Sequence, residues 1–457
     1  MEFSGTLILI GAVLTQLALP PGPSALPVIG NVLQMDKRAP FKTMLKLSDK
    51  YGSVMTMYLG PQRTVILLGY DAVKEALVDQ ADDFSGRGPI PLLFKASKGY
   101  GLGVSNGECW QQLQRFTLTT LRDFGMGCKG MEEWIQEESS HLLLHHVHSK
   151  PFDPTFFLSC TVSNVICCLV FGQRFSYDDK HFLYLLQIIS DTLKFGSSSQ
   201  GQLYNIFPRL MEWLPGSHHN VFAKLEEMRA FIMNKIQERQ DTLDASSPRD
   251  YIDCFLLRLN KHIPTSQFHY DNLVSTVLNL YVAGTETTSS TIRYALNVLI
   301  KYPQIQETIQ QEIDTLVGQR CPCMEDKKSL PYTDAVLHEI QHFLDIIPLS
   351  IPHYALHDIS FRGYTIPKAT PRSFNPQHFL DNNGNFKKNP AFLPFSAGKR
   401  SCIGESLARM EIFLFLVSLL QHFTFSCPGG PDSIDLSPEY SGFANVPRRY
   451  TIIATPG

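Results

Sequence analysis

Phe395-Ser-Ala-Gly398-Lys-Arg400-Ser-Cys402-Ile-Gly404 is the most specific segment of this 457-residue chain. It places one cysteine in a glycine-rich, basic loop, directly before apolar spacing that predicts a helix over 403–422. Free N–H groups at the start of that helix, with Lys399 and Arg400 beside the cysteine, predict a lowered thiol pKa. A lone thiolate of this kind suits an axial ligand of haem iron, where it favours O–O cleavage. The alternative is a structural cysteine in a tight turn, but core packing gives no reason for the surrounding glycines and arginine.

This loop matches the haem-binding signature of the cytochromes P-450, Phe-x-x-Gly-x-Arg-x-Cys-x-Gly, at Phe395, Gly398, Arg400, Cys402 and Gly404. The chain resembles that superfamily over about residues 20–457, and most of all its vertebrate microsomal family 2 members. The resemblance implies the cytochrome P-450 fold, which is mainly α with small β-sheets. It also implies that the cofactor is haem b (iron protoporphyrin IX), with Cys402 as the metal ligand.

The composition is that of a large globular protein. The chain is 44% hydrophobic and has no linker, repeat or low-complexity tract after residue 31, so residues 32–457 are predicted to form one domain. A net charge of −3 predicts no nucleic-acid partner. The ten cysteines lack the paired spacing of a disulfide scaffold, which indicates that the folded part faces a reducing compartment.

The N-terminus has a different character from the rest of the chain. Residues 3–19 carry no charge, and residues 1–19 are predicted to be a short membrane anchor. A cleaved signal peptide is the rival interpretation, but the segment lacks a basic start and a small-x-small cleavage site. Residues 20–31 are predicted to be a proline-rich hinge. This organisation predicts a protein of the endoplasmic reticulum membrane with a cytosolic catalytic domain, in contact with membrane lipid.

Helical spacing dominates the chain after residue 107, with a few short β-type runs. A hairpin is predicted around Gly60-Pro61, a helix from Asp71 to about residue 79, and a glycine-rich loop over 85–107. β-type runs are predicted near 359–366 and 440–455. Apolar residues spaced three and four apart predict helices over 109–122, 131–147, 155–171, 181–195, 218–242, 269–301, 303–317, 333–345 and 403–422.

The predicted helix over 269–301 contains Ala283-Gly-Thr-Glu286-Thr287-Thr288. Glycine and threonine inside a helix cost stability, which suggests a site or a kink. A solvent-facing threonine stripe is the plain alternative. The segment also matches the Ala/Gly-Gly-x-Asp/Glu-Thr-Thr/Ser pattern of the resembling family. That match implies that Thr287 hydrogen-bonds the bound dioxygen, that Glu286 helps relay protons, and that Ala283 lies against haem and substrate.

Two haem carboxylates need cations or hydrogen-bond donors when they are buried. By resemblance, the residues that match these propionate partners are Arg87, Trp110, His353 and Arg400. A core aromatic and an ordinary loop histidine are the alternatives for Trp110 and His353 taken singly.

The function that the resemblance implies is that of a haem-thiolate monooxygenase. It would insert one atom of O2 into apolar substrates such as xenobiotics, fatty acids or steroids. Electrons would come from NADPH-cytochrome P-450 reductase, with cytochrome b5 as a second candidate donor. The substrate pocket would be lined by parts of the 90–104 loop, Ala283, Ile347 and Ile351, which are mostly apolar or small.

Three positions depart from the family pattern. Gln114 stands where Trp-x-x-x-Arg has arginine, and His342 stands where Glu-x-x-Arg has arginine, although Glu339 and the third cluster member His378 are present. Histidine cannot reproduce the bidentate fork of arginine, and loss of a buried ion pair costs about 3–5 kcal/mol. A strand, a turn and a short helix are also missing after Lys368. A catalytically impaired haem-binding variant is therefore the alternative function, whereas Glu286-Thr287 and the lack of an output domain disfavour a haem sensor.

Overall fold

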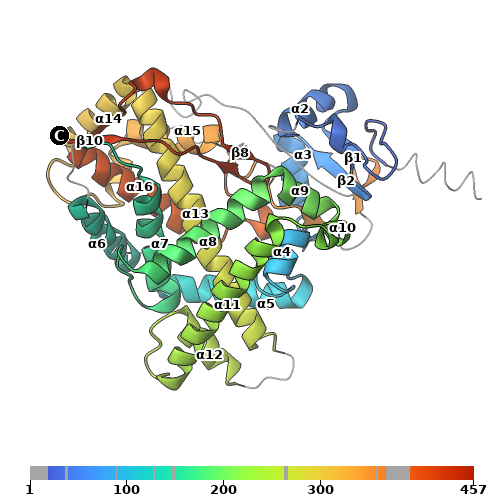
Figure 1. Cartoon of the computed structure of the whole chain (residues 1–457), viewed down its shortest axis with the longest axis horizontal. Coiled ribbons are helices and arrows are strands. Elements are labelled where there is room, and N and C mark those ends of the chain that lie inside the picture. The colour runs from blue at the N-terminus through green and yellow to red at the C-terminus, as the bar shows by residue number, and fades with distance from the viewer. Residues whose placement is uncertain are drawn as a thin grey trace, which may run out of the picture.

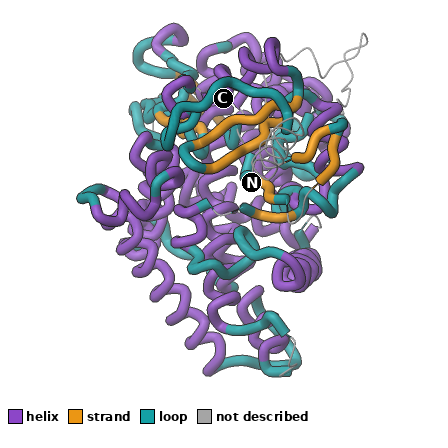
Figure 2. Tube along the Cα trace, turned by 90° about the vertical axis from the view of Figure 1, so that its right-hand side faces the viewer, coloured by secondary structure: helices purple, strands orange, loops and turns teal. Residues whose placement is uncertain are grey.

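Helix α13 (Tyr270–Lys301) runs through the middle of the molecule and organises the helices around it (Figure 1). The structure is a computed structural model that describes residues 19–36, 40–88, 90–126, 129–145, 150–261, 266–344, 346–348, 350–355, 359–366 and 392–457. Helices make up most of the trace in Figure 2, and short strands lie among them in its upper part. The mainly α fold with small β-sheets is confirmed.

The other α-helices are α2 (Pro40–Tyr51), α3 (Tyr70–Lys74), α4 (Pro91–Ala96), α5 (Gly107–Asp123), α6 (Lys129–His145), α7 (Thr155–Phe171), α8 (Lys180–Ser197), α9 (Ser199–Ile206), α10 (Pro208–Trp213), α11 (Ser217–Asp241), α12 (Tyr251–Leu259), α14 (Pro303–Leu316), α15 (Pro331–Leu344) and α16 (Glu405–His422). Shorter helical turns are η1 (Val32–Gln34), η2 (Glu75–Asp79), η3 (Asp326–Lys328), η5 (Gly398–Arg400) and η6 (Pro431–Ser433).

The strands form five antiparallel pairs in the described residues. These pairs are β1 (Val54–Leu59) with β2 (Gln62–Leu67), β3 (Gly86–Arg87) with β4 (His353–Tyr354), β5 (Ile359–Phe361) with β6 (Tyr364–Ile366), β7 (Phe423–Ser426) with β10 (Ile453–Pro456), and β8 (Tyr440–Ser441) with β9 (Asn445–Val446).

The core forms where α7 and α13 pack together, because α7 is apolar on nearly all sides and must be buried. Gly284 of α13 meets Ile166 of α7 so closely that a side-chain carbon at Gly284 would overlap it. The missing side chain of Gly284 makes room for α7, so this glycine has a packing role.

Local signals explain the helix ends. Asp179 caps α8, because its carboxylate accepts hydrogen bonds from the backbone N–H groups of His181 and Phe182. Gly172 ends α7 in the left-handed conformation that glycine adopts without strain. Pro303 starts α14, where a missing N–H costs nothing. Such signals explain why the long helices lie within a few residues of the predicted ranges.

The short elements were predicted less well. The region over 85–107 was predicted to be loop, but it contains α4 as well as β3. The sequence analysis also missed α2, α9, α10 and α12. Except for α2, which has 12 residues, these helices have six to nine residues and give too few turns for apolar periodicity to stand out. They are stabilised by packing against neighbouring elements, because isolated helices of this length are not stable in water.

The proline-rich segment over 20–31 lies against β1. The backbone N–H of Thr56 donates to the carbonyl of Pro21 at 2.9 Å, and that of Asn31 donates to Tyr58 at 2.7 Å. Within the described ranges, none of the helices combines the length and apolar composition that a membrane crossing requires. The anchor predicted over 1–19 falls outside those ranges, except for Leu19. All nine cysteines within them are free thiols.

Candidate active site

The cysteine loop is a tight turn that closes on itself. The backbone N–H of Cys402 donates to the carbonyl of Phe395 at 2.9 Å. Gly398 has a φ of +72°, and a side-chain carbon there would overlap the carbonyl of Leu77 in η2. Glycine is therefore required at this position by both conformation and space. Gly404 then caps α16, so that Cys402 lies just before the helix N-terminus.

The Cys402 side chain is exposed, yet its thiol lies in a partly desolvated loop. Burial raises the pKa of the Cys402 thiol, and the Gly404 N–H only partly offsets this. The predicted lowering by nearby cations is therefore wrong. Lys399 pairs with the carboxylate of Asp82, and Arg400 points toward backbone carbonyls instead of the sulfur.

Arg87 and Arg400 form a pair of buried cations. Arg87 Nη1 donates to the carbonyl of Ile351 at 2.7 Å, and Arg400 donates to the carbonyls of Ser85 and Ser105 at 2.7 Å each. Burial lowers the pKa of Arg87 to about 10, and burial with repulsion from Arg87 lowers that of Arg400 to about 9. Neither guanidinium pairs with a carboxylate among the described residues. Two desolvated cations of this kind, with no carboxylate beside them in the described ranges, favour the binding of anions.

Trp110 and His353 lie beside these arginines. The Arg400 guanidinium is 3.8 Å from the Trp110 ring centroid, which is a cation–π contact. His353 in β4 lies opposite Arg87 in the antiparallel pair of β3 and β4. The Nδ1 atom of His353 is 2.7 Å from the carbonyl oxygen of Phe84. The structure thus brings the four predicted propionate partners together from four separate segments.

The middle of α13 has one face that protein atoms do not cover. Ala283 is exposed and Thr287 half-buried, whereas the residues that follow up to Leu296 are buried. The Thr287 hydroxyl donates to the Ala283 carbonyl at 2.7 Å, which is the helix back-bond expected from the sequence.

The Glu286 side chain extends from α13 toward Arg293 and not toward the uncovered face. It is buried, and its Oε1 lies 3.8 Å from Arg293 Nη1. Burial raises the pKa of Glu286, opposed by Arg293. Neighbouring positions on a helix are about 100° apart, so Glu286 and Thr287 do not share a face. A proton that passes between them must travel by way of water or a rotated side chain.

Glu411 on α16 was missed by the sequence analysis. It is fully buried beside the Thr288 hydroxyl, and burial raises the pKa of its carboxyl well above the ordinary value. A glutamate within a run of apolar helix residues was the available signal. Its buried position next to the threonines of α13 indicates a neutral acid in the native state.

We expect Glu411→Gln to stabilise the protein by about 1–3 kcal/mol at pH 8 and by less at pH 5. A raised carboxyl pKa means that the native state loses stability as the pH rises above the unfolded value, because only the unfolded carboxyl ionises freely. An uncharged amide removes this dependence. Urea unfolding of both proteins at the two pH values measures it, and an equal effect at both would contradict a neutral buried acid.

Gln114 contacts the cysteine loop in place of the family's arginine. Its Nε2 donates to the carbonyl of Lys399 at 2.8 Å, so α5 stays connected to the loop. Arg115 is exposed, in line with its expected position on another face of the helix. At this position the structure therefore has a neutral contact to the loop backbone.

Glu339 and His342 face each other on α15. His342 Nδ1 lies 3.1 Å from Glu339 Oε2, while Glu339 Oε1 is buried with no hydrogen-bond partner in the described part of the chain. His378, the predicted third member, lies outside the described residues. Arg409 of α16 makes a second link between α15 and the cysteine loop. Its Nη1 is 3.3 Å from His338 Nε2, and its guanidinium carbon is 5.0 Å from the centroid of the Phe395 ring.

His342→Arg is expected to raise the free energy of unfolding by about 1–3 kcal/mol and to increase haem content. Arginine supplies several donors, enough to satisfy both oxygens of Glu339. Thermal unfolding and the haem-to-protein absorbance ratio measure the two effects. His422→Arg, an exposed change of the same chemistry at the end of α16, is the control. No gain over that control would show that this fold has another local solution.

Of the predicted substrate-side groups, Ile351 contacts the arginine pair and the 90–104 segment contacts α13. Ile351 is half-buried and its carbonyl accepts from Arg87, and Ile347 is half-buried one turn earlier. The segment over 90–104 is tied to α13, because the Gly101 and Gly103 N–H groups donate to Asn272 and Asn279 at 2.9 Å each. These contacts fix the segment beside the exposed face of α13.

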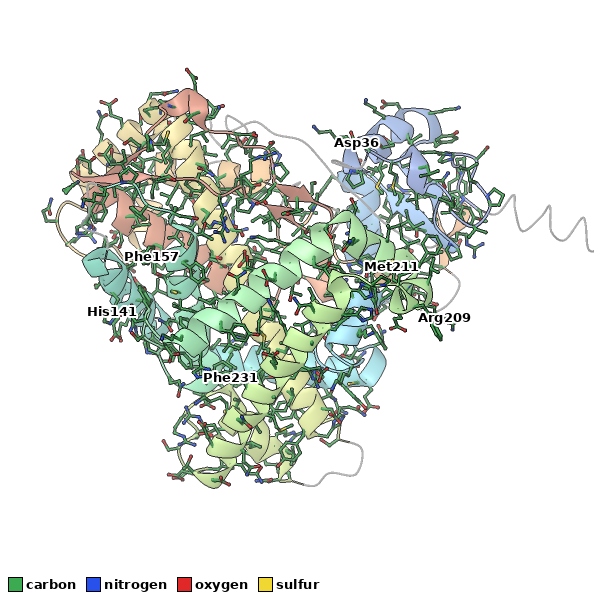
Figure 3. The ribbon with its side chains drawn as sticks, in the orientation of Figure 1. Asp36, His141, Phe157, Arg209, Met211 and Phe231 are labelled. Atoms are coloured by element: carbon green, nitrogen blue, oxygen red, sulfur yellow. The ribbon has the colours of Figure 1, made fainter. Side chains whose placement is uncertain are left out.

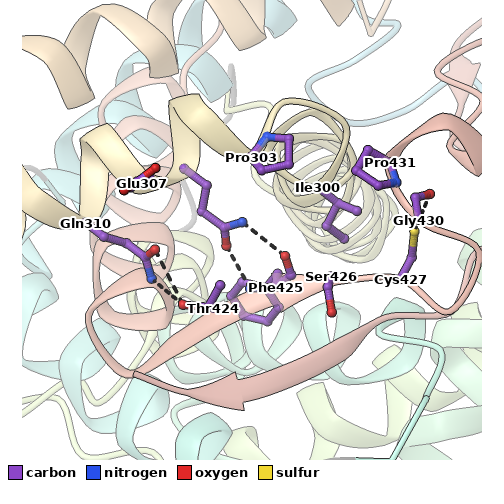
Figure 4. Close-up of a pocket in the computed structure, with 11 residues that line it drawn as sticks. Ile300, Pro303, Glu307, Gln310, Thr424, Phe425, Ser426, Cys427, Gly430 and Pro431 are labelled. Atoms are coloured by element: carbon purple, nitrogen blue, oxygen red, sulfur yellow. Dashed lines mark hydrogen bonds between the residues drawn. The ribbon is translucent and has the colours of Figure 1, made fainter.

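A separate surface pocket of about 420 Å³ lies between the end of α13, α14 and β7 (Figure 4). The amide of Gln306 bonds both backbone groups of Phe425 there, at 3.0 and 2.7 Å, and so caps the free edge of β7. None of the predicted site residues lines this pocket. The amides of Gln306 and Gln310 that line it already bond the backbone of β7, so we assign it a structural role.

The residues present fit haem. Cys402 is exposed, the arginine pair offers two cations to anionic groups, and α13 presents an uncovered face with a hydroxyl. Cys402 would hold the iron, and Arg87, Trp110, His353 and Arg400 would hold the propionates. Haem supplies the redox chemistry by which dioxygen is activated.

The family model for cytochrome P450 matches residues 20–370 and 369–454. The chain belongs to the cytochrome P450 family. It is 49% identical to cytochrome P450 2F3 of Capra hircus, covering 95% of this chain and 93% of that protein. It is 49% identical to cytochrome P450 2G1 of Rattus norvegicus over 95% and 92% of the two chains. It is 47% identical to cytochrome P450 2F1 of Homo sapiens over 96% and 94%. The resemblance to vertebrate family 2 is thereby confirmed. Membership implies haem, dioxygen, an organic substrate and a redox partner.

The family match is interrupted where a segment was predicted to be missing. Its two blocks meet at residues 369 and 370, just after Lys368. The alignment with the Capra hircus protein runs over 457 positions but uses only 95% of this 457-residue chain. The relative therefore has residues with no counterpart here. Residues 367–391 lie outside the described ranges.

Proposed function

We propose that this cytochrome P450 is a membrane-anchored haem-thiolate monooxygenase that inserts one oxygen atom into apolar organic substrates. It takes electrons from an NADPH-dependent flavoprotein reductase, with cytochrome b5 as a second donor, and its cofactor is haem b. Xenobiotics, fatty acids or steroids are its substrate class. The single observation that carries the proposal is the exposed Cys402 beside Arg400, which forms with Arg87 a buried pair of cations without a carboxylate partner in the described residues.

Different residues of the site would hold the cofactor, supply protons and bind the substrate. Cys402 would hold the iron of haem, and the arginine pair would hold its carboxylates. Thr287 presents a hydroxyl on the uncovered face of α13, where it can donate or hold a proton. Ala283, Ile347 and Ile351 offer small and apolar surface, which binds apolar molecules and excludes water.

The carbon monoxide difference spectrum of the reduced protein tests the proposal. A Soret band at the thiolate position, followed by NADPH-dependent product formation with added reductase, supports a monooxygenase. A band at the position of a neutral thiol, or a colourless protein after reconstitution with haem, contradicts it.

A catalytically impaired haem-binding protein is the second candidate. Two observations favour it: the interrupted family match after Lys368, and the Glu339 oxygen that lacks a partner in the described residues. Such a protein would bind haem but would turn over slowly or lose its thiolate on reduction. The same spectrum separates the two candidates, because only the active enzyme combines a stable thiolate band with product.

We place the protein at the endoplasmic reticulum membrane with its catalytic domain in the cytosol. An apolar rim of exposed side chains on and around α9 and α10 supports contact with lipid. This apolar rim consists of Leu203, Leu210, Trp213 and Leu214, and Trp213 is 90% exposed. Figure 3 shows Arg209 and Met211 on the same helix α10, close to the β1–β2 hairpin. A cation beside apolar side chains suits the boundary between lipid tails and head groups.

A protein that lacks residues 1–19 is expected to bind neutral lipid vesicles through the apolar rim. Leu210→Asp with Trp213→Asp should lower the partition coefficient by at least about tenfold, because two apolar side chains no longer enter the lipid. Vesicle flotation measures this. The matched control is Tyr302→Asp with Leu316→Asp, two exposed side chains elsewhere on the surface. Equal binding of the two double variants would exclude the rim as a lipid contact.

A further inference from the structure

We propose that Asn106 is a positioning residue that holds the two propionate-binding arginines in place and thereby controls how tightly the protein retains haem. The inference rests on the haem-binding function proposed above. No pattern in the sequence singled out this residue.

Asn106 stands in the N-cap position of α5, but its side chain does not cap the helix. An asparagine there ordinarily accepts a hydrogen bond from the first turn. Here its Oδ1 accepts from the backbone N–H of Arg87 at 2.6 Å, and its Nδ2 donates to the backbone carbonyl of Arg87 at 2.9 Å. The side-chain amide of Asn106 therefore bonds both backbone groups of Arg87, the N–H and the carbonyl, and fixes the position of β3.

The same amide also contacts the second arginine. Arg400 Nη2 donates to Asn106 Oδ1 at 3.2 Å, and to the carbonyl of the preceding Ser105 at 2.7 Å. Arg87 and Arg400 are about three hundred residues apart in the chain, and both are positioned relative to Asn106. One side chain thus couples the strand that carries Arg87 to the loop that carries Cys402.

A neutral amide is well suited to position 106, beside two buried arginines. Two like charges in a desolvated setting repel each other, and each loses hydration. A neutral oxygen stabilises the guanidinium without cancelling its charge. The pair therefore keeps its net positive charge for the carboxylates of haem. A carboxylate at residue 106 would stabilise the same cations but would compete with the cofactor for them.

Asn164 provides a matched control at a distance from the site. Its amide has the same pattern, with Oδ1 accepting from Phe175 N–H at 2.9 Å and Nδ2 donating to Phe175 O at 2.9 Å. It also contacts a charged group, Glu138, at 3.2 Å. Because Asn164 is buried, its loss is expected to cost at least as much stability as the loss of Asn106.

The experiment measures two quantities on full-length protein: the rate of haem transfer to excess apomyoglobin, and the thermal unfolding midpoint of the haem-free protein. We expect Asn106→Ala to speed haem transfer about 10–100-fold. Asn164→Ala should lower the unfolding midpoint at least as far as Asn106→Ala does. Its rate of haem transfer should nevertheless stay within about twofold of that of the unsubstituted protein. Asn106→Asp should release haem as fast as Asn106→Ala while unfolding at a higher temperature.

Haem transfer from Asn106→Ala that is no faster than from Asn164→Ala would overturn the inference, as would full haem retention by Asn106→Asp. If Asn106→Ala does not fold, the rate of haem transfer from Asn106→Asp alone tests the inference. An unsubstituted protein that binds no haem would instead overturn the proposed function, and this inference with it.

Discussion

Cys402→Ala is expected to abolish the thiolate Soret band of the reduced carbon monoxide complex and to reduce product formation to the background of the reductase alone. The thiol is the accessible sulfur that the loop between Phe395 and Gly404 presents at the start of α16. Alanine leaves the loop intact, because its geometry depends on backbone hydrogen bonds and on Gly398. The measured quantities are the difference spectrum and the turnover with NADPH.

Cys427→Ala is the control for that experiment. Cys427 also lies in a turn, with its Sγ 2.9 Å from the carbonyl oxygen of Gly430, but it belongs to the surface near β7. Its loss should leave the spectrum and turnover unchanged. A thiolate band that survives in Cys402→Ala, or disappears in Cys427→Ala, would show that Cys402 is not the iron ligand.

Thr287→Val is expected to uncouple NADPH oxidation from product formation. The product formed per NADPH should fall about 10–100-fold, and hydrogen peroxide should rise in proportion, because the site loses the hydroxyl that we propose delivers protons. Valine keeps the shape of threonine, so packing changes little. Thr287→Ser should restore most of the coupling, since serine keeps the hydroxyl. Parallel assays of NADPH, product and peroxide give the ratio.

Thr291→Val tests whether the effect belongs to the hydroxyl or to the helix. Thr291 is one turn further along α13 and makes the same kind of back-bond, to the Thr287 carbonyl at 2.9 Å. A bent or loosened helix would uncouple both variants. We expect coupling to be normal in Thr291→Val, and unchanged coupling in Thr287→Val would remove Thr287 from the proton path.

The helices could be predicted well where the pattern is long and local. The expected range over 155–171 is the same as that of α7, and the range over 269–301 differs from α13 by one residue. Apolar spacing over several turns is a property of the segment itself. The six-residue helices α4 and α10 have no such signal, and they form where neighbouring elements cover them.

The site could be predicted as a set of residues but not as a set of contacts. Arg87, Trp110, His353 and Arg400 do lie together. The direction of Arg400, which points away from the sulfur, could not be read from its position next to Cys402. Nor could the contact of Glu286 with Arg293, or the role of Asn106.

The amino-acid sequence alone determined the cysteine loop, the long helices and the membership that they indicate, because each depends on residue types at short, regular spacing. Tertiary structure alone decided which charges meet, which glycine serves packing, and which amide couples the two arginines. Burial and hydrogen-bond pairing depend on segments as far apart as residues 87 and 400, and the free energy of a buried charge is set by whatever those segments place beside it.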